Sequence, residues 1–287
     1  MKKYKEKFVN VGDADISYEV SNGSNPVVFM HGYGINHTLF NNVRAQLPEE
    51  FGSVSIDLRG HGKSTYLKNA TDFSLEKCTS DLEKILDAES AENPVIVGHS
   101  MGSMIAQNFA ARHPTEVKGL VLISGSYNFA ESFGSNLISR LALKLSPLRK
   151  SLYGSLNAVV GPFVRENNDF FEDFSNQKFR DISNARLFFE MYCKTSPEFV
   201  KSIGAVGEAI MEWDTTKIAS NISAQTLLIH GEQDKVVNPK TSYELYKMIP
   251  NARKPIIVPN TDHNIVLKNP EVVNEYIQRF LQEINLK

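Results

Sequence analysis

Short apolar runs that alternate with helical patterns are the feature of this sequence that most limits its fold. Each run ends in a turn of polar residues or glycine, as expected of a strand that is buried on both faces. The runs are Val27–Met30, Val54–Ile56, Val95–Val97, Leu120–Ile123, Leu227–Ile229 and Ile256–Val258. Helical patterns at Leu75–Ala88, Met101–Arg112 and Val273–Leu281 lie between or after them. The alternation predicts a largely parallel α/β sheet, preceded by a hairpin of Phe8–Val11 and Ile16–Val20.

Charge and hydropathy exclude several classes of function. The 287 residues carry a formal net charge of −2, and the isoelectric point is near 6.4. This balance lacks the basic surface that binding to nucleic acid or to an anionic membrane requires. No apolar run approaches the roughly 20 residues of a membrane-spanning helix, and residues 8–13 are too polar for a signal peptide. We therefore expect a soluble, cytoplasmic protein.

The sequence gives no sign of a metal site or of a bound cofactor. The two cysteines, Cys78 and Cys193, are far apart and lack the spacing of metal ligands. The sequence contains no H-E-x-x-H pattern, and no G-x-G-x-x-G follows a predicted strand. We therefore expect the chemistry to come from side chains of the chain alone.

One long segment, residues 126–213, interrupts the alternation. It contains no clear buried strand and is helix-prone, and it lies between the runs Leu120–Ile123 and Leu227–Ile229. A helical insertion at this point would lie over the carboxyl ends of the strands, where open α/β sheets bind ligands. The sequence therefore predicts one catalytic domain formed by residues 1–125 and 214–287, with a helical cap at 126–213.

The strongest local signal is Gly98-His99-Ser100-Met101-Gly102, between a predicted strand and a predicted helix. A serine on such a tight turn is held in a strained backbone conformation with its hydroxyl above the sheet. The amide of Met101 would lie at a helix N-terminus, where unpaired donors and the helix dipole favour negative charge. This context predicts that Ser100 is a nucleophile and that Met101 contributes to an oxyanion hole.

A serine nucleophile needs a base, and the base needs a carboxylate to orient it. Of the seven histidines, His263 lies in the loop before the last helix, at the carboxyl edge of the sheet. Asp234 follows the strand that ends near His230, at the same edge, and its neighbour Glu232 is the main alternative. The order Ser, Asp, His along the chain favours Ser100, Asp234 and His263 as a catalytic triad.

These motifs together resemble those of the α/β-hydrolase fold. The elbow at 98–102 is similar to that of the family, and His31-Gly32-Tyr33-Gly34 resembles its oxyanion segment. Residues 57–64 match its D-x-R-G-x-G-x-S loop, and residues 231–234 resemble its acid turn. The resemblance implies a mostly parallel eight-stranded sheet flanked by helices, with the cap inserted after strand 6. It also implies that the second oxyanion donor is the amide of Tyr33, with Gly34 as the alternative.

Asp262 departs from the family pattern, which usually has glycine immediately before the catalytic histidine. A carboxylate at this position could raise the pKa of the histidine or offer it a competing partner.

The predicted function is hydrolysis of a small carboxylic ester, or of a related acyl substrate, through an acyl-enzyme on Ser100. Carbon–carbon bond hydrolysis, lactone hydrolysis and perhydrolysis are alternatives that the resemblance allows with the same triad. A different class is a small-ligand sensor that kept the fold without turnover. The expected partner is a small molecule, and the sequence assigns no substrate-binding residue and no oligomeric state.

Overall fold

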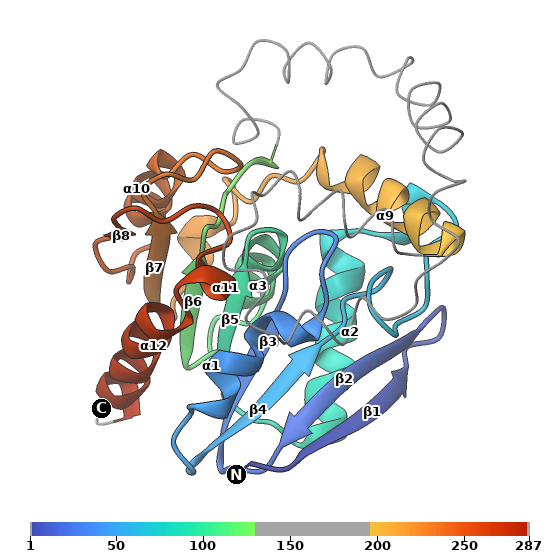
Figure 1. Cartoon of the computed structure of the whole chain (residues 1–287), viewed down its shortest axis with the longest axis horizontal. Coiled ribbons are helices and arrows are strands. Elements are labelled where there is room, and N and C mark those ends of the chain that lie inside the picture. The colour runs from blue at the N-terminus through green and yellow to red at the C-terminus, as the bar shows by residue number, and fades with distance from the viewer. Residues whose placement is uncertain (1, 130–195, 286–287) are drawn as a thin grey trace.

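The computed structural model describes residues 2–129 and 196–285. Its eight-stranded sheet has the order β1-β2-β4-β3-β5-β6-β7-β8 (Figure 1). The strands are β1 (Tyr4–Asn10), β2 (Asp15–Ser21), β3 (Asn25–Met30), β4 (Phe51–Ile56), β5 (Val95–His99), β6 (Gly119–Ile123), β7 (Gln225–Gly231) and β8 (Ile256–Val258). β1 pairs antiparallel with β2, and β2 pairs antiparallel with β4, whereas all later pairs are parallel. The predicted mostly parallel sheet and opening hairpin are therefore confirmed.

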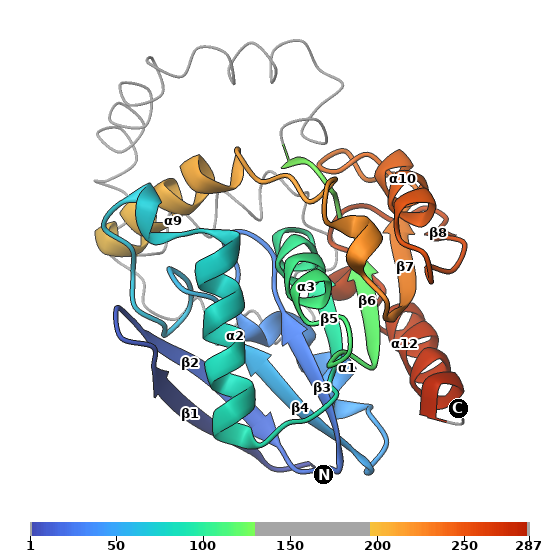
Figure 2. The same cartoon turned by 180° about the vertical axis from the view of Figure 1, so that it is seen from behind.

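Helices cover both faces of this sheet, as Figures 1 and 2 show from opposite sides. One face carries α2 (Leu75–Glu89), α3 (Met101–Arg112) and α10 (Lys240–Met248), and the other carries α1 (Asn41–Ala45) and α12 (Pro270–Asn285). The short helix α11 (Ile265–Lys268) precedes α12, and 3₁₀ turns span His37–Phe40, Ala70–Asp72 and Ala219–Asn221. Among the described residues, no helix is long and apolar enough to cross a membrane.

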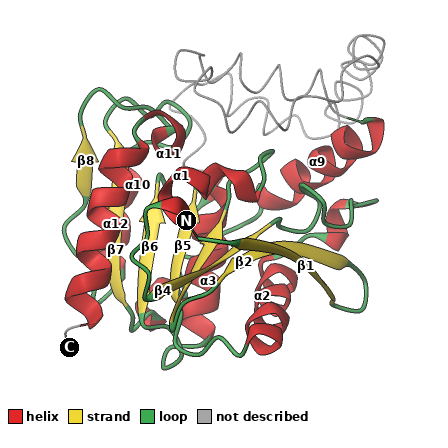
Figure 3. Ribbon diagram, turned by 60° about the horizontal axis from the view of Figure 1, so that its bottom comes forward, coloured by secondary structure: helices red, strands yellow, loops and turns green. Residues whose placement is uncertain are grey.

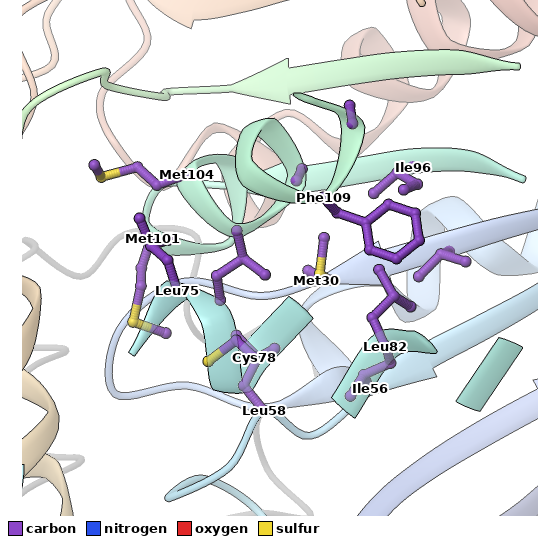
Figure 4. Packing of buried hydrophobic residues seen from close by; sticks show 14 of the residues in the cluster. Met30, Ile56, Leu58, Leu75, Cys78, Leu82, Ile96, Met101, Met104 and Phe109 are labelled. Atoms are coloured by element: carbon purple, nitrogen blue, oxygen red, sulfur yellow. The ribbon is translucent and has the colours of Figure 1, made fainter. Parts of the chain in front are cut away.

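Two apolar clusters hold the helices to the sheet. Figure 4 shows part of the larger one, in which side chains of α2 and α3 meet those of the central strands. Met30 of β3, Ile96 of β5 and Phe109 of α3 are buried there together. Because both faces of β3 and β5 are covered, their residues form continuous apolar runs rather than an alternating pattern. Burial on both faces therefore holds the central strands, and with them the loops at their carboxyl ends, in place.

The helix α9 (Pro197–Ile210) lies above the carboxyl ends of the central strands (Figures 1 and 3). The hydroxyl of Ser202 accepts a hydrogen bond from the amide of Leu67 at 2.8 Å and donates one to the carbonyl of Gly60 at 2.9 Å. Val206 and Ile210 belong to the larger apolar cluster. Buried contacts therefore attach α9 to the loop that follows β4.

α9 belongs to the predicted cap at 126–213, of which residues 130–195 lie outside the described residues. The residues at the two ends of the predicted cap lie side by side. The amide of Phe129 donates to the carbonyl of Trp213 at 3.2 Å, and that of Thr215 donates to the carbonyl of Tyr127 at 2.7 Å. The two ends of the predicted cap are therefore hydrogen-bonded neighbours, and both lie next to the end of β6.

Candidate active site

Ser100 lies on the turn between β5 and α3, as predicted. Its backbone has φ 52° and ψ −115°, a conformation with positive φ that residues other than glycine rarely adopt. The two glycines of the motif allow this turn to pack tightly. A Cβ on Gly98 would lie 2.5 Å from the carbonyl oxygen of Gly102, and one on Gly102 would lie 2.3 Å from that of Met30. The pattern of glycines is thus a steric requirement of the turn.

His263 and Asp234 reach Ser100 from loops after two neighbouring strands. Asp234 lies in the turn after β7, and His263 lies in the loop between β8 and α11. Nε2 of His263 is 2.9 Å from Oγ of Ser100, and Nδ1 of His263 is 2.7 Å from Oδ2 of Asp234. Because the carboxylate can only accept, Nδ1 carries the proton, which leaves Nε2 to accept the proton of the serine hydroxyl. The three predicted residues are therefore hydrogen-bonded in one chain.

Asp234 is buried and accepts hydrogen bonds on both carboxylate oxygens. Oδ1 accepts from the amides of Val236 and Val237 at 2.8 and 2.9 Å. Burial alone would raise the pKa of this carboxyl group. Hydrogen bonds from His230 and His263 outweigh that effect and hold the pKa well below its usual value. Asp234 is therefore ionised at neutral pH.

The two carboxylates that could compete for His263 both point elsewhere. Glu232 is exposed, and its Oε2 accepts from the amide of Asn260 at 3.2 Å. Asp262 accepts from the amide of Asn264 at 3.0 Å, and its Oδ2 lies 2.5 Å from Nζ of Lys268. The carboxylate beside His263 is therefore paired with Lys268 at the end of α11 rather than with the imidazole.

The residues after β3 form the side of the site that faces the elbow. A Cβ on Gly32 would lie 3.2 Å from Cβ of Ser100, so this segment runs directly past the serine. The amide of Gly34 donates to Nε2 of His61 at 3.1 Å, which favours Tyr33 over Gly34 as the predicted second oxyanion donor. Met101 is the first residue of α3, and amides in a first helical turn have no acceptor within their own helix.

Two buried histidines hold this segment. Nδ1 of His31 donates to the carbonyl of Gly32 at 2.7 Å, while its Nε2 accepts from the amide of Leu58 at 3.0 Å. His61 donates from Nδ1 to the carbonyl of Arg59 at 3.1 Å. Burial lowers the pKa of His31 to about 3 and that of His61 to about 4. Both rings are therefore neutral, and each one links the segment to the loop after β4.

His99, the residue before the serine, connects the elbow to the loop that carries His263. Its Nε2 donates to the backbone carbonyl of His263 at 3.0 Å, and burial lowers its pKa to about 3. Among the described residues its Nδ1 has no hydrogen-bond partner, and it is the atom closest to the Cβ that Gly32 lacks, at 2.9 Å. His99 thus lies between the segment after β3 and the loop after β8.

Sequence reasoning missed the contact between His230 and Asp234. Nε2 of His230, near the end of β7, is 3.1 Å from Oδ2 of Asp234, the oxygen that also pairs with His263. The only sequence signal for this contact is the four-residue spacing of the two residues across a strand end. Within the parts of the chain that the structure describes, no three His, Cys, Asp or Glu side chains form a group that could hold a metal ion.

Comparison with known proteins places the chain in a family. The model of the alpha/beta hydrolase fold matches residues 25–270. A pimeloyl-[acyl-carrier protein] methyl ester esterase of Wigglesworthia glossinidia brevipalpis is 25% identical over 93% of this chain and 97% of its own length.

Solved structures give the same result for the fold. A bromoperoxidase from Bacillus anthracis superposes with a TM-score of 0.74 at 20% identity, over 97% of this chain and 100% of its own. The enol-lactonase from Burkholderia xenovorans LB400 has a TM-score of 0.72 at 20% identity, over 96% and 100%. Since the family model matches residues 25–270, the chain belongs to the alpha/beta hydrolase fold family, and the esterase relative supports an enzyme of the hydrolase class.

Proposed function

We propose that this chain is a serine hydrolase that cleaves a small carboxylic ester, or a related acyl substrate, through an acyl-enzyme on Ser100. The observation that carries the proposal is the continuous hydrogen-bonded chain from Oγ of Ser100 through His263 to Asp234, with distances of 2.9 and 2.7 Å. A buried carboxylate, an imidazole with its Nε2 lone pair directed at a hydroxyl, and a strained serine together form the arrangement that activates a serine for attack.

In the first proposed step, Oγ of Ser100 adds to the carbonyl carbon of the ester while its proton passes to Nε2 of His263. The imidazolium that forms is stabilised by the ionised Asp234 at its Nδ1. Negative charge develops on the former carbonyl oxygen, and the amides of Tyr33 and Met101 are proposed to bind it. One such donor contributes about 3 kcal/mol to the stability of a transition state of this kind.

In the second half of the reaction, the tetrahedral intermediate collapses. The bond to the alkoxy group breaks, His263 returns its proton to that oxygen, and an alcohol leaves. Water then adds to the acyl carbon while His263 takes its proton, and the carboxylic acid departs as the proton returns to Oγ of Ser100. Each proton is thus carried by the same nitrogen, and the proposed reaction requires no cofactor.

An ester is favoured as the substrate class by the similarity to the methyl ester esterase of Wigglesworthia. The proposed partner is a small molecule that reaches the carboxyl ends of the strands. We further propose the domain arrangement predicted from the sequence, in which residues 1–125 and 214–287 hold the triad and residues 126–213 form a cap over it. The attachment of α9 to the loops after β3 and β4 supports this arrangement.

The decisive experiment compares the wild type with Ser100→Ala on p-nitrophenyl esters of increasing acyl length. We expect the variant to lose a factor of about 10⁴ or more in kcat. A fluorophosphonate probe should attach to Ser100, as located by peptide mass spectrometry, and should leave the neighbouring Ser103 unmodified. Equal rates in the two proteins, or labelling at another residue, would exclude the proposed nucleophile.

The same assay separates the alternatives. A lactone and a vinylogous diketone, tested beside the esters, would show greater kcat/KM if lactone or carbon–carbon bond hydrolysis were the main activity. Perhydrolysis would appear as peracid formed from hydrogen peroxide and the acyl-enzyme. Tight binding of a small molecule by a protein that neither turns over nor reacts with the probe would indicate a sensor and would exclude the proposed hydrolase.

A further inference from the structure

His230 is a fully buried histidine that the proposed mechanism does not use. It lies near the end of β7, and its ring contacts Asp234 directly. We infer that His230 is a positioning residue, which donates a second hydrogen bond to Asp234 and holds its carboxylate in the orientation and charge state that His263 requires. The inference rests on the proposed function, because it assigns His230 a role in the serine hydrolase reaction.

The contacts of the ring determine which nitrogen carries the proton. Nε2 of His230 faces two oxygens, Oδ2 of Asp234 at 3.1 Å and the backbone carbonyl of Val237 at 3.0 Å. Both of these oxygens can only accept, so Nε2 must donate. Nδ1 lies 2.7 Å from Oγ of Ser242 in α10, a hydroxyl that can donate to it. The neutral ring with its proton on Nε2 therefore satisfies every contact.

The same contacts fix the ring at both ends. Ser242 is only 1% exposed and comes from α10, while Val237 belongs to the turn that carries Asp234. Rotation of the ring would break hydrogen bonds to both segments at once. His230 thus connects the end of β7, the acid turn and α10, and it presents one N–H to the carboxylate with little freedom to move.

Asp234 depends on this donor because its carboxylate is entirely enclosed. The side chains of Asp234 and His230 are both 0% exposed, so water does not replace a lost hydrogen bond there. Oδ1 is held by two backbone amides, whereas Oδ2 is held by the rings of His230 and His263. Without His230, Oδ2 would keep His263 as its single donor.

Other ionisable groups near the carboxylate do not substitute for His230. His263 reaches Asp234 from the loop after β8, and His99 lies nearby on the elbow with its Nε2 directed to the carbonyl of His263. Asp262 is paired with Lys268, and exposed Glu232 accepts from a backbone amide. Among the side chains described near Asp234, His230 and His263 are the two that hydrogen-bond to it. Their hydrogen bonds are also the strongest influences that lower the pKa of Asp234 against the effect of burial.

The test compares His230→Leu, which removes the donor at similar volume, with His230→Gln, whose amide can place a donor near the Nε2 position. For His230→Leu we expect kcat to fall roughly tenfold to hundredfold, since misplacing a reactive group by about 1 Å can cost about 10²-fold. KM should stay within about twofold, because the ring does not face the substrate. His230→Gln should recover most of the lost rate.

The pH profile separates positioning from a merely structural role. With one donor fewer, Asp234 becomes more basic and stabilises the protonated form of His263 more strongly. The acid limb of kcat/KM should therefore move to higher pH in His230→Leu and stay near the wild-type position in His230→Gln. Thr226→Val is a matched control, since Thr226 lies on the same strand, is equally buried, and its hydroxyl donates to the carbonyl of Ala224 rather than to Asp234.

Two further measurements keep the test informative. If His230→Leu does not fold, Ser242→Ala removes the hydroxyl that fixes the ring and should show the same shift at smaller size. The rate of labelling of Ser100 by the fluorophosphonate probe reports the nucleophile even if the substrate class is wrong. An unmoved acid limb and labelling rate in a folded His230→Leu protein would overturn the role of His230 alone. A wild type that neither labels at Ser100 nor cleaves any ester would overturn the proposed function together with it.

Discussion

The two sides of Ser100 are built on different physical principles. On the proposed acid–base side, the side chains of His263 and His230 are both hydrogen-bonded to the carboxylate of Asp234. On the oxyanion side, the proposed donors are backbone amides of Tyr33 and Met101, which hold no charge and change no protonation state. One side therefore depends on ionisation, and the other depends on the placement of the main chain.

Histidines occur on both sides, and the difference in their surroundings shows how burial assigns their roles. The hydrogen bonds of His31 and His61 all go to backbone groups, and burial keeps their pKa values near 3 and 4. They serve as neutral connectors between loops. His230 and His263 instead face the carboxylate of Asp234. A histidine next to a buried carboxylate can take part in proton transfer or in the control of charge, whereas burial keeps the rings of His31 and His61 neutral.

The largest effect is expected on the acid–base side. Asp234→Asn should lower kcat by about 10⁴-fold, since an amide can donate to His263 and so favour the wrong tautomer. Glu232→Gln is the matched control, because Glu232 is exposed and turned toward the backbone of Asn260. Steady-state kinetics on a p-nitrophenyl ester measures both. A greater loss of kcat in Glu232→Gln than in Asp234→Asn would mean that Glu232, and not Asp234, is the acid.

A smaller effect is expected on the oxyanion side. His61→Leu removes the acceptor of the Gly34 amide and should let the segment after β3 shift. We expect kcat to fall by up to about 10²-fold, less than the loss of an oxyanion donor itself, which costs about 10²–10³-fold. His61→Gln, which keeps an acceptor, should retain more activity. The acid limb of kcat/KM should stay in place in both variants, and a shift like that expected for His230→Leu would contradict the separation of the two sides.

The pH dependence of stability tests the neutral histidines directly. In the unfolded chain a histidine binds a proton as the pH falls below about 6.5, whereas His31, His61 and His99 bind one in the folded protein only near pH 3 to 4. The unfolded state thus holds more protons in this window, so the free energy of unfolding should decrease as the pH falls from about 6.5 toward 4. Each histidine contributes at most about 1.4 kcal/mol per pH unit.

Calorimetric unfolding in buffers of different ionisation enthalpy measures this proton uptake. His99→Gln keeps a donor toward the carbonyl of His263 and should take up about one proton fewer than the wild type at pH 5. Equal uptake by the two proteins would mean that His99 is already protonated in the folded state.

The sequence predicted the elements whose signals are local. The strand before Ser100 and the helix Met101–Arg112 follow from a continuous apolar run and a helical pattern, and both were confirmed. β1 begins at Tyr4 rather than at the predicted Phe8. Lys5 and Glu6 near its start are exposed and charged, and the strand pairs with β2 through the main chain at the edge of the sheet. Hydrophobic patterning cannot reveal such pairing.

The predicted triad residues were brought within hydrogen-bonding distance, whereas the residues that hold them were not foreseen. His61 and Gly34 are 27 residues apart, and their contact depends on how two loops meet above the sheet. Sequence spacing alone gives no direction to such a side chain. His230 is only four residues from Asp234, but at a strand end that spacing has no regular geometry from which a contact follows. Motifs therefore indicate the reacting groups better than they indicate the groups that support them.

The smallest effect is expected where the oxyanion side meets α9. The hydroxyl of Tyr33 donates to the carbonyl of Ile203 within α9 at 3.0 Å, and it lies where a Cβ on Gly207 would come within 2.9 Å. Tyr33→Phe removes this hydrogen bond while keeping the ring and the backbone amide. It should lower the stability of the protein by about 1 kcal/mol. Because α9 lies above the strand ends where substrate enters in the proposed mechanism, KM should rise more than kcat falls, and both changes should stay below about tenfold.

Chemical denaturation and ester kinetics measure these quantities, and Gly207→Ala, which pushes against the same hydroxyl, should change KM in the same direction. A large fall in kcat with unchanged KM in Tyr33→Phe would instead mean that the hydroxyl sets the position of the oxyanion donor, and the two sides of Ser100 would then share a dependence on side chains.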